Sequence, residues 1–198
     1  MKLILIAYII LNSFINEKII VELQPYNNFK INEIKELVPK LKEFITNELN
    51  LNPVFIIKSP QNLSDDLYNV NHSRYRGNKI INKYKQKASK KHIIIGLLHD
   101  DISTTLRNHD DWGILGLSIL NTYTCVVSDY RLKNKNRDYW KVIIHEFIHT
   151  YYCVSHCSKD VETCIMKDAK GKANFKNKFK LCDYCKYNLK LLNLYKNE

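Results

Sequence analysis

Two histidines and a glutamate form an H-E-x-x-H pattern at His145, Glu146 and His149. On a helix, residues four apart stand on one face, one turn from each other, so both imidazoles can present a nitrogen to a single metal ion. Zinc suits such ligands, and a catalytic zinc typically has three protein ligands and a water. Glu146 lies about 100° round the helix from His145, where its carboxylate can take a proton from the zinc-bound water. The alternative is a buried helix that happens to carry two histidines.

Further residues of metal-ligand type follow at short intervals. His156 comes seven positions after His149, and it is followed by the cysteines Cys157, Cys164, Cys182 and Cys185. The last two form a C-x-x-C, a spacing that lets two thiolates hold one zinc ion. Two disulfides and a redox-active C-x-x-C are the alternatives, and no βαβ pattern lies nearby to favour the redox motif. The clustering favours a second zinc site.

These motifs resemble the archaemetzincin family of zinc metallopeptidases, whose pattern is H-E-x-x-H-x-x-G-x-x-H-C-x4-C-x-M, followed after a spacer by C-x-x-C. The likeness covers about residues 92–186. It implies that the catalytic zinc is held by His145, His149 and His156, with Glu146 as general base. It also implies a methionine turn beneath the site at Met166 and a structural zinc held by four cysteines, Cys157, Cys164, Cys182 and Cys185.

The sequence departs from the family pattern just after the second histidine. His156 is one residue further from His149 than in the family, and the family's glycine falls at Tyr152, or at Cys153 if the extra residue comes earlier. A glycine there lets the chain leave the helix with positive φ, so this chain must turn in another way. Loop lengths change at small cost in free energy. We therefore expect both zinc sites to survive, with His156 the ligand most dependent on the altered turn.

The elements that must position these residues can be read from hydrophobic periodicity. Apolar runs predict strands over residues 19–24, 54–57, 92–98 and 122–128, and helical spacing predicts helices over residues 31–49, 75–88 and 183–195. Pro39 predicts a kink or two short helices in the first of these, and Asp138 is placed to N-cap the helix that carries His145. Metzincins have an edge strand that binds extended substrate, and by resemblance residues 112–120 are our candidate for it. The expected fold is α/β (α+β), a metzincin-like mixed sheet with the H-E-x-x-H helix beneath a cleft.

Composition fits one packed domain over residues 18–198, because 45% of the 198 residues are hydrophobic and 11% aromatic. Residues 1–17 read MKLILIAYIILNSFINE, a lysine followed by a short apolar run, which is typical of a signal peptide and too short for an ordinary transmembrane helix. We expect export to the periplasm or the exterior. The alternative is a buried first strand or helix, in which case the protein would be cytoplasmic.

The formal net charge is +11, and residues 167–198 hold nine lysines against three acidic residues. This basic end raises the alternative of a nucleic-acid-binding zinc module. Because the charge is spread along the chain, a solvated lysine surface explains it more simply, and we do not expect a nucleic-acid partner. We predict a monomeric metallopeptidase with two zinc ions that hydrolyses peptide or protein substrates. The altered spacing before His156 motivates the other alternative, a zinc-binding protein with little or no peptidase activity.

Overall fold

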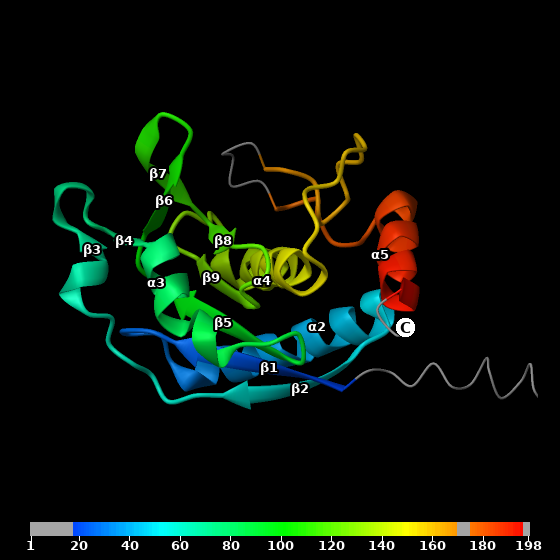
Figure 1. Ribbon diagram of the computed structural model, residues 1–198, viewed down its shortest axis with the longest axis horizontal. Helices are drawn as coiled ribbons and strands as arrows, with labels where there is room; N and C mark the ends of the chain where they lie inside the picture. The colour runs from blue at the N-terminus through cyan, green and yellow to red at the C-terminus, as the bar shows by residue number, and fades with distance from the viewer. Residues whose placement is uncertain (1–17, 170–174, 196–198) are drawn as a thin grey trace, which may run out of the picture.

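The computed structural model describes residues 18–169 and 175–195 (Figure 1). Residues 1–17, for which the sequence predicts a signal peptide, lie outside the described residues. The strands are β1 (Lys18–Pro25), β2 (Asn52–Ile57), β3 (Tyr68–Asn69), β4 (Arg74–Arg76), β5 (His92–Leu98), β6 (Ile102–Leu106), β7 (His109–Ile114), β8 (Gly116–Ser118) and β9 (Thr124–Ser128). The α-helices are α2 (Ile31–Leu49), α3 (Gly77–Tyr84), α4 (Lys135–Tyr152) and α5 (Asp183–Tyr195), and short 3₁₀ turns lie at Asp65–Leu67, Val70–His72 and Lys85–Lys87. None of these helices is long and apolar enough to cross a membrane.

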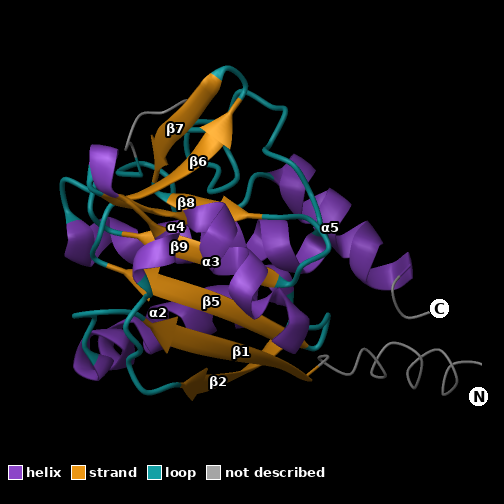
Figure 2. Ribbon diagram, turned by 60° about the vertical axis from the view of Figure 1, so that its left-hand side comes forward, coloured by secondary structure: helices purple, strands orange, loops and turns teal. Residues whose placement is uncertain are grey.

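The main sheet has the strand order β2-β1-β5-β9-β8 (Figure 2). The strands β2, β1, β5 and β9 run parallel, and β8 pairs with β9 antiparallel at the edge. The near-continuous apolar sequences of β5 and β9 suit strands that are covered on both faces. The predicted strands are therefore confirmed. The 112–120 segment divides between β7 and β8, and its second part forms the edge strand.

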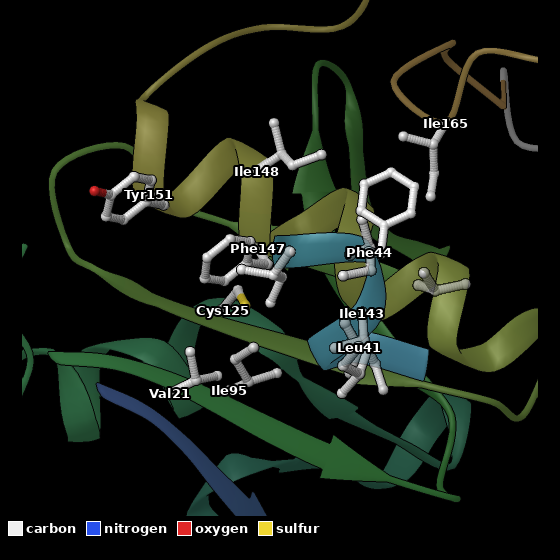
Figure 3. Close-up of a cluster of buried hydrophobic side chains, with 14 of the residues drawn as sticks. Val21, Leu41, Phe44, Ile95, Cys125, Ile143, Phe147, Ile148, Tyr151 and Ile165 are labelled. Carbon is white, nitrogen blue, oxygen red and sulfur yellow. The ribbon is translucent and has the colours of Figure 1, made fainter. Parts of the chain in front are cut away.

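Helices cover both faces of this sheet, with α2 and α4 on one face and α3 on the other. The period of two along each strand sorts the side chains, so that Ile95 and Cys125 point toward α4 while Val126 packs beside α3. Figure 3 shows the larger core, in which Phe147 from α4 lies over Ile95 and Cys125. The main core therefore lies directly under the helix that carries the histidines.

A smaller sheet of order β3-β4-β6-β7 lies beside the main one, and its β6–β7 hairpin projects away from the body (Figures 1 and 2). Ion pairs made by two aspartates with buried side chains stabilise the position of this smaller sheet. Asp101 forms an ion pair with Arg131 at 2.6 Å, and Asp111 forms one with Arg76 at 2.8 Å. Hydrophobic periodicity does not reveal this sheet, because its strands are short and carry many polar side chains.

Two helix predictions need correction. The helix α2 is one continuous helix that contains Pro39, so of the two alternatives, a kink or two short helices, the second was wrong. Its buried face, with Ile34, Leu41 and Ile45, packs on the main core and offsets the cost of the interior proline. The helix predicted over residues 75–88 begins only at Gly77, because the preceding residues form β4 and pair with β6.

The N-cap of α4 was also predicted wrongly. The cap is Asn134, whose side-chain oxygen accepts the Arg137 N–H at 3.0 Å. Asp138 lies inside the helix, where its own N–H already donates to the Asn134 carbonyl. Its buried carboxylate instead forms ion pairs with Arg137 at 2.6 Å and Lys141 at 3.0 Å. These partners hold the pKa of Asp138 below its usual value.

Candidate active site and metal centres

The helix α4 places the three residues of the H-E-x-x-H pattern where solvent has little access to them. His145, Glu146 and His149 are 5%, 7% and 8% exposed. The rest of the helix is anchored by Val142, Phe147 and their neighbours in the core. These three side chains therefore lie on a helix that is packed into the core rather than on a loop.

Each of the two helix histidines has one ring nitrogen fixed by a backbone carbonyl. Nδ1 of His145 lies 2.7 Å from the Ile165 carbonyl oxygen, and Nδ1 of His149 lies 2.6 Å from the Val154 carbonyl oxygen. A carbonyl oxygen can only accept, so both Nδ1 atoms carry a hydrogen. In the neutral rings, both Nε2 atoms are then bare acceptors. They face each other at 3.0 Å.

Two facing acceptors need a positive species between them. A shared proton is disfavoured, because burial lowers the pKa of His145 well below its usual value and that of His149 to about 4. A metal ion satisfies both lone pairs without protonating either ring. The carbonyl partners are also the outer contacts that metal-binding histidines usually make. The donor set therefore fits a metal ion.

His156 completes this group from the loop after α4. Its ring centroid lies 5.1 Å from that of His145 and 4.7 Å from that of His149. One ligand atom from each of the three histidines lies within 4.8 Å of the others, so they could hold one ion. The extra residue before His156 therefore does not pull this histidine away. Its imidazole is exposed, so one side of the group opens to solvent.

The altered turn is made by Cys153, the second of the two positions considered for the missing glycine. Cys153 ends α4 in the left-handed conformation, with φ 56° and ψ 41°, and its N–H donates to the His149 carbonyl at 3.0 Å. The helix continues to Tyr152, and two residues then lie between Cys153 and His156, as in the G-x-x-H part of the family pattern. The chain thus turns as a glycine would, but with a side chain present.

Replacing Cys153 with glycine is expected to stabilise the protein. A side chain in the left-handed region costs about 1–2 kcal/mol, and the flexibility of glycine in the unfolded chain returns about 0.5–1 kcal/mol of that. Cys153→Gly should therefore raise the free energy of unfolding by up to about 1 kcal/mol, measured by urea denaturation. Ser155→Gly, at a neighbouring position without positive φ, should lower it. A destabilised Cys153→Gly would show that the thiol contact with Asn121 outweighs the backbone strain.

The four cysteines named from the sequence form a second compact group. The sulfurs of Cys157 and Cys182 are 3.6 Å apart, those of Cys164 and Cys185 are 3.7 Å apart, and all four lie within 4.8 Å of one another. Tetrahedral Zn–S bonds of about 2.3 Å would place sulfurs roughly 3.8 Å apart. All six cysteines of the chain are free thiols. The arrangement fits a tetrahedral metal site rather than two disulfides.

The ionisation of this group also fits a cation. The proton of the hydrogen bond between the Cys164 and Cys185 sulfurs lowers the pKa of Cys164 to about 5 and raises the pKa of Cys185. A metal ion would replace that proton and bind the thiolates.

A tight turn links the two groups. Cys164 begins it, and its carbonyl accepts the N–H of Lys167 at 3.0 Å. Within the turn, the Ile165 carbonyl holds Nδ1 of His145, and the Met166 carbonyl accepts the N–H of Cys157 at 2.8 Å. Met166 is 2% exposed. The methionine therefore lies buried in the turn that joins the cysteine group to the histidine group.

Glu146 lies against the edge strand β8. Its Oε2 accepts a hydrogen bond from the Ser118 hydroxyl at 2.8 Å. A Cβ at Gly116 would stand only 2.6 Å from its Oε1. Burial raises the pKa of Glu146 to about 7, and the bond from Ser118 opposes that rise. The carboxyl group is thus poised to exchange a proton near neutral pH.

Of the nine residues singled out from the sequence, the seven of ligand type form two compact groups, Glu146 lies on the same helix as His145 and His149, and Met166 lies in the turn between the groups. Sequence reasoning missed the residues that surround them: Gly116 and Ser118 on β8, Thr150 on α4, and Phe175, whose ring meets the edge of His145 with centroids 6.0 Å apart. The period of two places Gly116 and Ser118 on one face of their strand, but only the packed structure shows that this face meets Glu146.

The mixed α/β fold therefore carries two groups of side chains, one of histidines and one of cysteines, that could each hold a metal ion. No family profile matches the sequence, and no curated protein matches it. Among solved structures, the archaemetzincin from Methanopyrus kandleri superimposes with a TM-score of 0.72 over 89% of this chain and 96% of that one, at 17% sequence identity. The chain has an archaemetzincin-like fold.

Proposed function

We propose that this protein is a zinc-dependent peptidase that cleaves peptide bonds in peptides or proteins. The observation that carries the proposal is the facing pair of bare Nε2 atoms, 3.0 Å apart, with His156 beside them. Each neighbouring Nδ1 is committed to a carbonyl, so these nitrogens are arranged to bind a metal ion rather than to hydrogen-bond. The archaemetzincin-like fold supports the same conclusion.

In this proposal, His145, His149 and His156 hold the catalytic zinc, and the four-cysteine group holds a second, structural zinc. When bound, the catalytic zinc supplies Lewis acidity that polarises the scissile carbonyl and makes water more acidic. Glu146 takes the proton from the attacking water and passes it to the leaving amine. Its raised pKa suits both transfers, because the carboxyl group can hold the proton briefly and release it.

The first test is the zinc content of the purified protein beside His149→Ala. We expect about two zinc ions in the parent and one in the variant, with chelator-sensitive cleavage of a mixed peptide library in the parent only. Asn121→Ala, which removes a polar side chain from a turn near the same helix end, should keep both ions. A parent with one zinc that His149→Ala does not change would contradict the proposal and favour a zinc-binding protein without peptidase activity.

A further inference from the structure

We propose that Ser118 is a positioning residue for Glu146, holding its Oε2 against the edge strand so that Oε1 is the oxygen that accepts the proton. The inference rests on the proposed peptidase function and deepens it. It starts from one contact, the 2.8 Å hydrogen bond from the Ser118 hydroxyl to Oε2.

Strand register places this hydroxyl. β8 pairs with β9 so that Ser118 lies opposite Cys125 and Gly116 lies opposite Val127. Residues two apart share a face of a strand, so Gly116 and Ser118 both face α4. Leu117 faces the opposite side and packs near Gly77 of α3. Two residues of the edge strand therefore face the carboxylate of Glu146. Gly116 has no side chain there, and Ser118 offers a hydroxyl.

The hydrogen bonds around Ser118 assign its proton. Thr150 donates its hydroxyl to Ser118 Oγ at 2.9 Å, and Ser118 Oγ lies within reach of both Oε2 and the backbone carbonyl of Glu146, at 2.8 and 2.9 Å. That carbonyl lies in the middle of α4, where the N–H four residues later already serves it. The carboxylate has no other hydrogen-bond donor in the described part of the chain. The single Ser118 proton therefore belongs to Oε2, where the charge is.

Gly116 leaves room for the other oxygen beside the edge strand. A Cβ there would lie 2.5 Å from Cγ and 2.6 Å from Oε1 of Glu146. Such separations are far below van der Waals contact, so any side chain at this position would displace the carboxylate. The missing side chain gives Oε1 its space while Ser118 fixes Oε2. The two residues together select one orientation of Glu146.

The test compares Ser118→Ala with Ser118→Thr in zinc-loaded protein. Loss of the hydroxyl should lower kcat about 10- to 100-fold while KM and zinc content stay close to the parent values, because misplacing a reacting group affects the chemical step. Ser118→Thr keeps a hydroxyl and should recover most of kcat. In a Glu146→Gln background, Ser118→Ala should cause no further loss, because the two residues act through the same group.

Thr122→Ala is the matched control. Its hydroxyl lies in the same hairpin and bonds the Ile119 carbonyl at 2.7 Å, away from Glu146. It should leave kcat unchanged. A Ser118→Ala variant that turns over like the parent would overturn the positioning role while the peptidase proposal stands.

A second readout does not depend on activity. In protein labelled with ¹³C at the glutamate carboxyl carbons, the Glu146 signal is the one missing from Glu146→Gln. The chemical shift of this signal should change in Ser118→Ala and stay unchanged in Thr122→Ala. An unchanged chemical shift in Ser118→Ala would overturn the hydrogen bond between Ser118 and Glu146. A parent that cleaves no peptide would overturn the peptidase proposal instead, and the NMR signal would still decide whether Ser118 holds the carboxylate.

Discussion

Glu146→Gln is expected to reduce kcat for peptide cleavage by about a thousandfold or more, within the range that general acid–base groups contribute. Glutamine keeps the size of the side chain but cannot accept the proton of the attacking water. The zinc content should not change, because the three histidines, not Glu146, form the metal-binding group. The measurement is kcat/KM on a fluorogenic peptide, with zinc determined on the same samples.

Glu162→Gln provides the control for this experiment. Its carboxylate is 73% exposed and lies 3.8 Å from the Lys167 ammonium, so the substitution removes the same charge outside the site. It should cleave at the parent rate. If Glu146→Gln matches the parent as well, the cleavage does not use this carboxylate and the proposed mechanism is wrong.

Cys185→Ser is expected to have the second large effect, on stability and on both metal sites. A serine hydroxyl is a poor zinc ligand, and structural zinc contributes directly to the folding free energy. The free energy of unfolding should fall by about 3 kcal/mol or more. Loosening the turn after Cys164 also releases the Ile165 carbonyl from His145. Loss of such an outer contact should weaken the remaining zinc about 10- to 100-fold.

Urea denaturation and zinc titration against a competing chelator measure these two effects. Cys153→Ser is the matched control, because this thiol lies outside the four-cysteine group and its loss should spare both ions. A Cys185→Ser protein with parent stability and two tightly bound zinc ions would show that the four cysteines do not hold a structural metal.

Two histidines and the four cysteines of the candidate metal groups were predictable because their spacing is local chemistry, whereas His156 was assigned through the family resemblance. The four-residue step from His145 to His149 fixes two ligands on one helix face whatever else the chain does, and the C-x-x-C at Cys182 does the same for two thiolates. Burial of the central strands was predictable for a similar reason, since a run such as HIIIGLL has no polar face to expose. These inferences needed no knowledge of distant contacts.

One failure is local, because Asp138 looked like a helix cap but the helix begins one turn earlier, with Asn134 as its cap. The others concern distant contacts. Pro39 is accommodated because the apolar face of α2 is packed on the sheet. The approach of Gly116 and Ser118 to Glu146 joins residues about thirty positions apart, and hydrophobic periodicity carries no signal for such a pairing.

The strand order of the main sheet has a consequence for the kinetics of folding. Its pairings are non-local, since Ile20 pairs with His92 and Ile94 with Thr124, whereas the ligand-type residues all fall between His145 and Cys185. Loop closure is faster for short separations. We therefore expect the C-terminal segment to gather its metal ligands before the sheet is complete. The edge strand, which needs β9 in place first, would then join α4 late, so competence for hydrolysis would appear after metal capture during refolding.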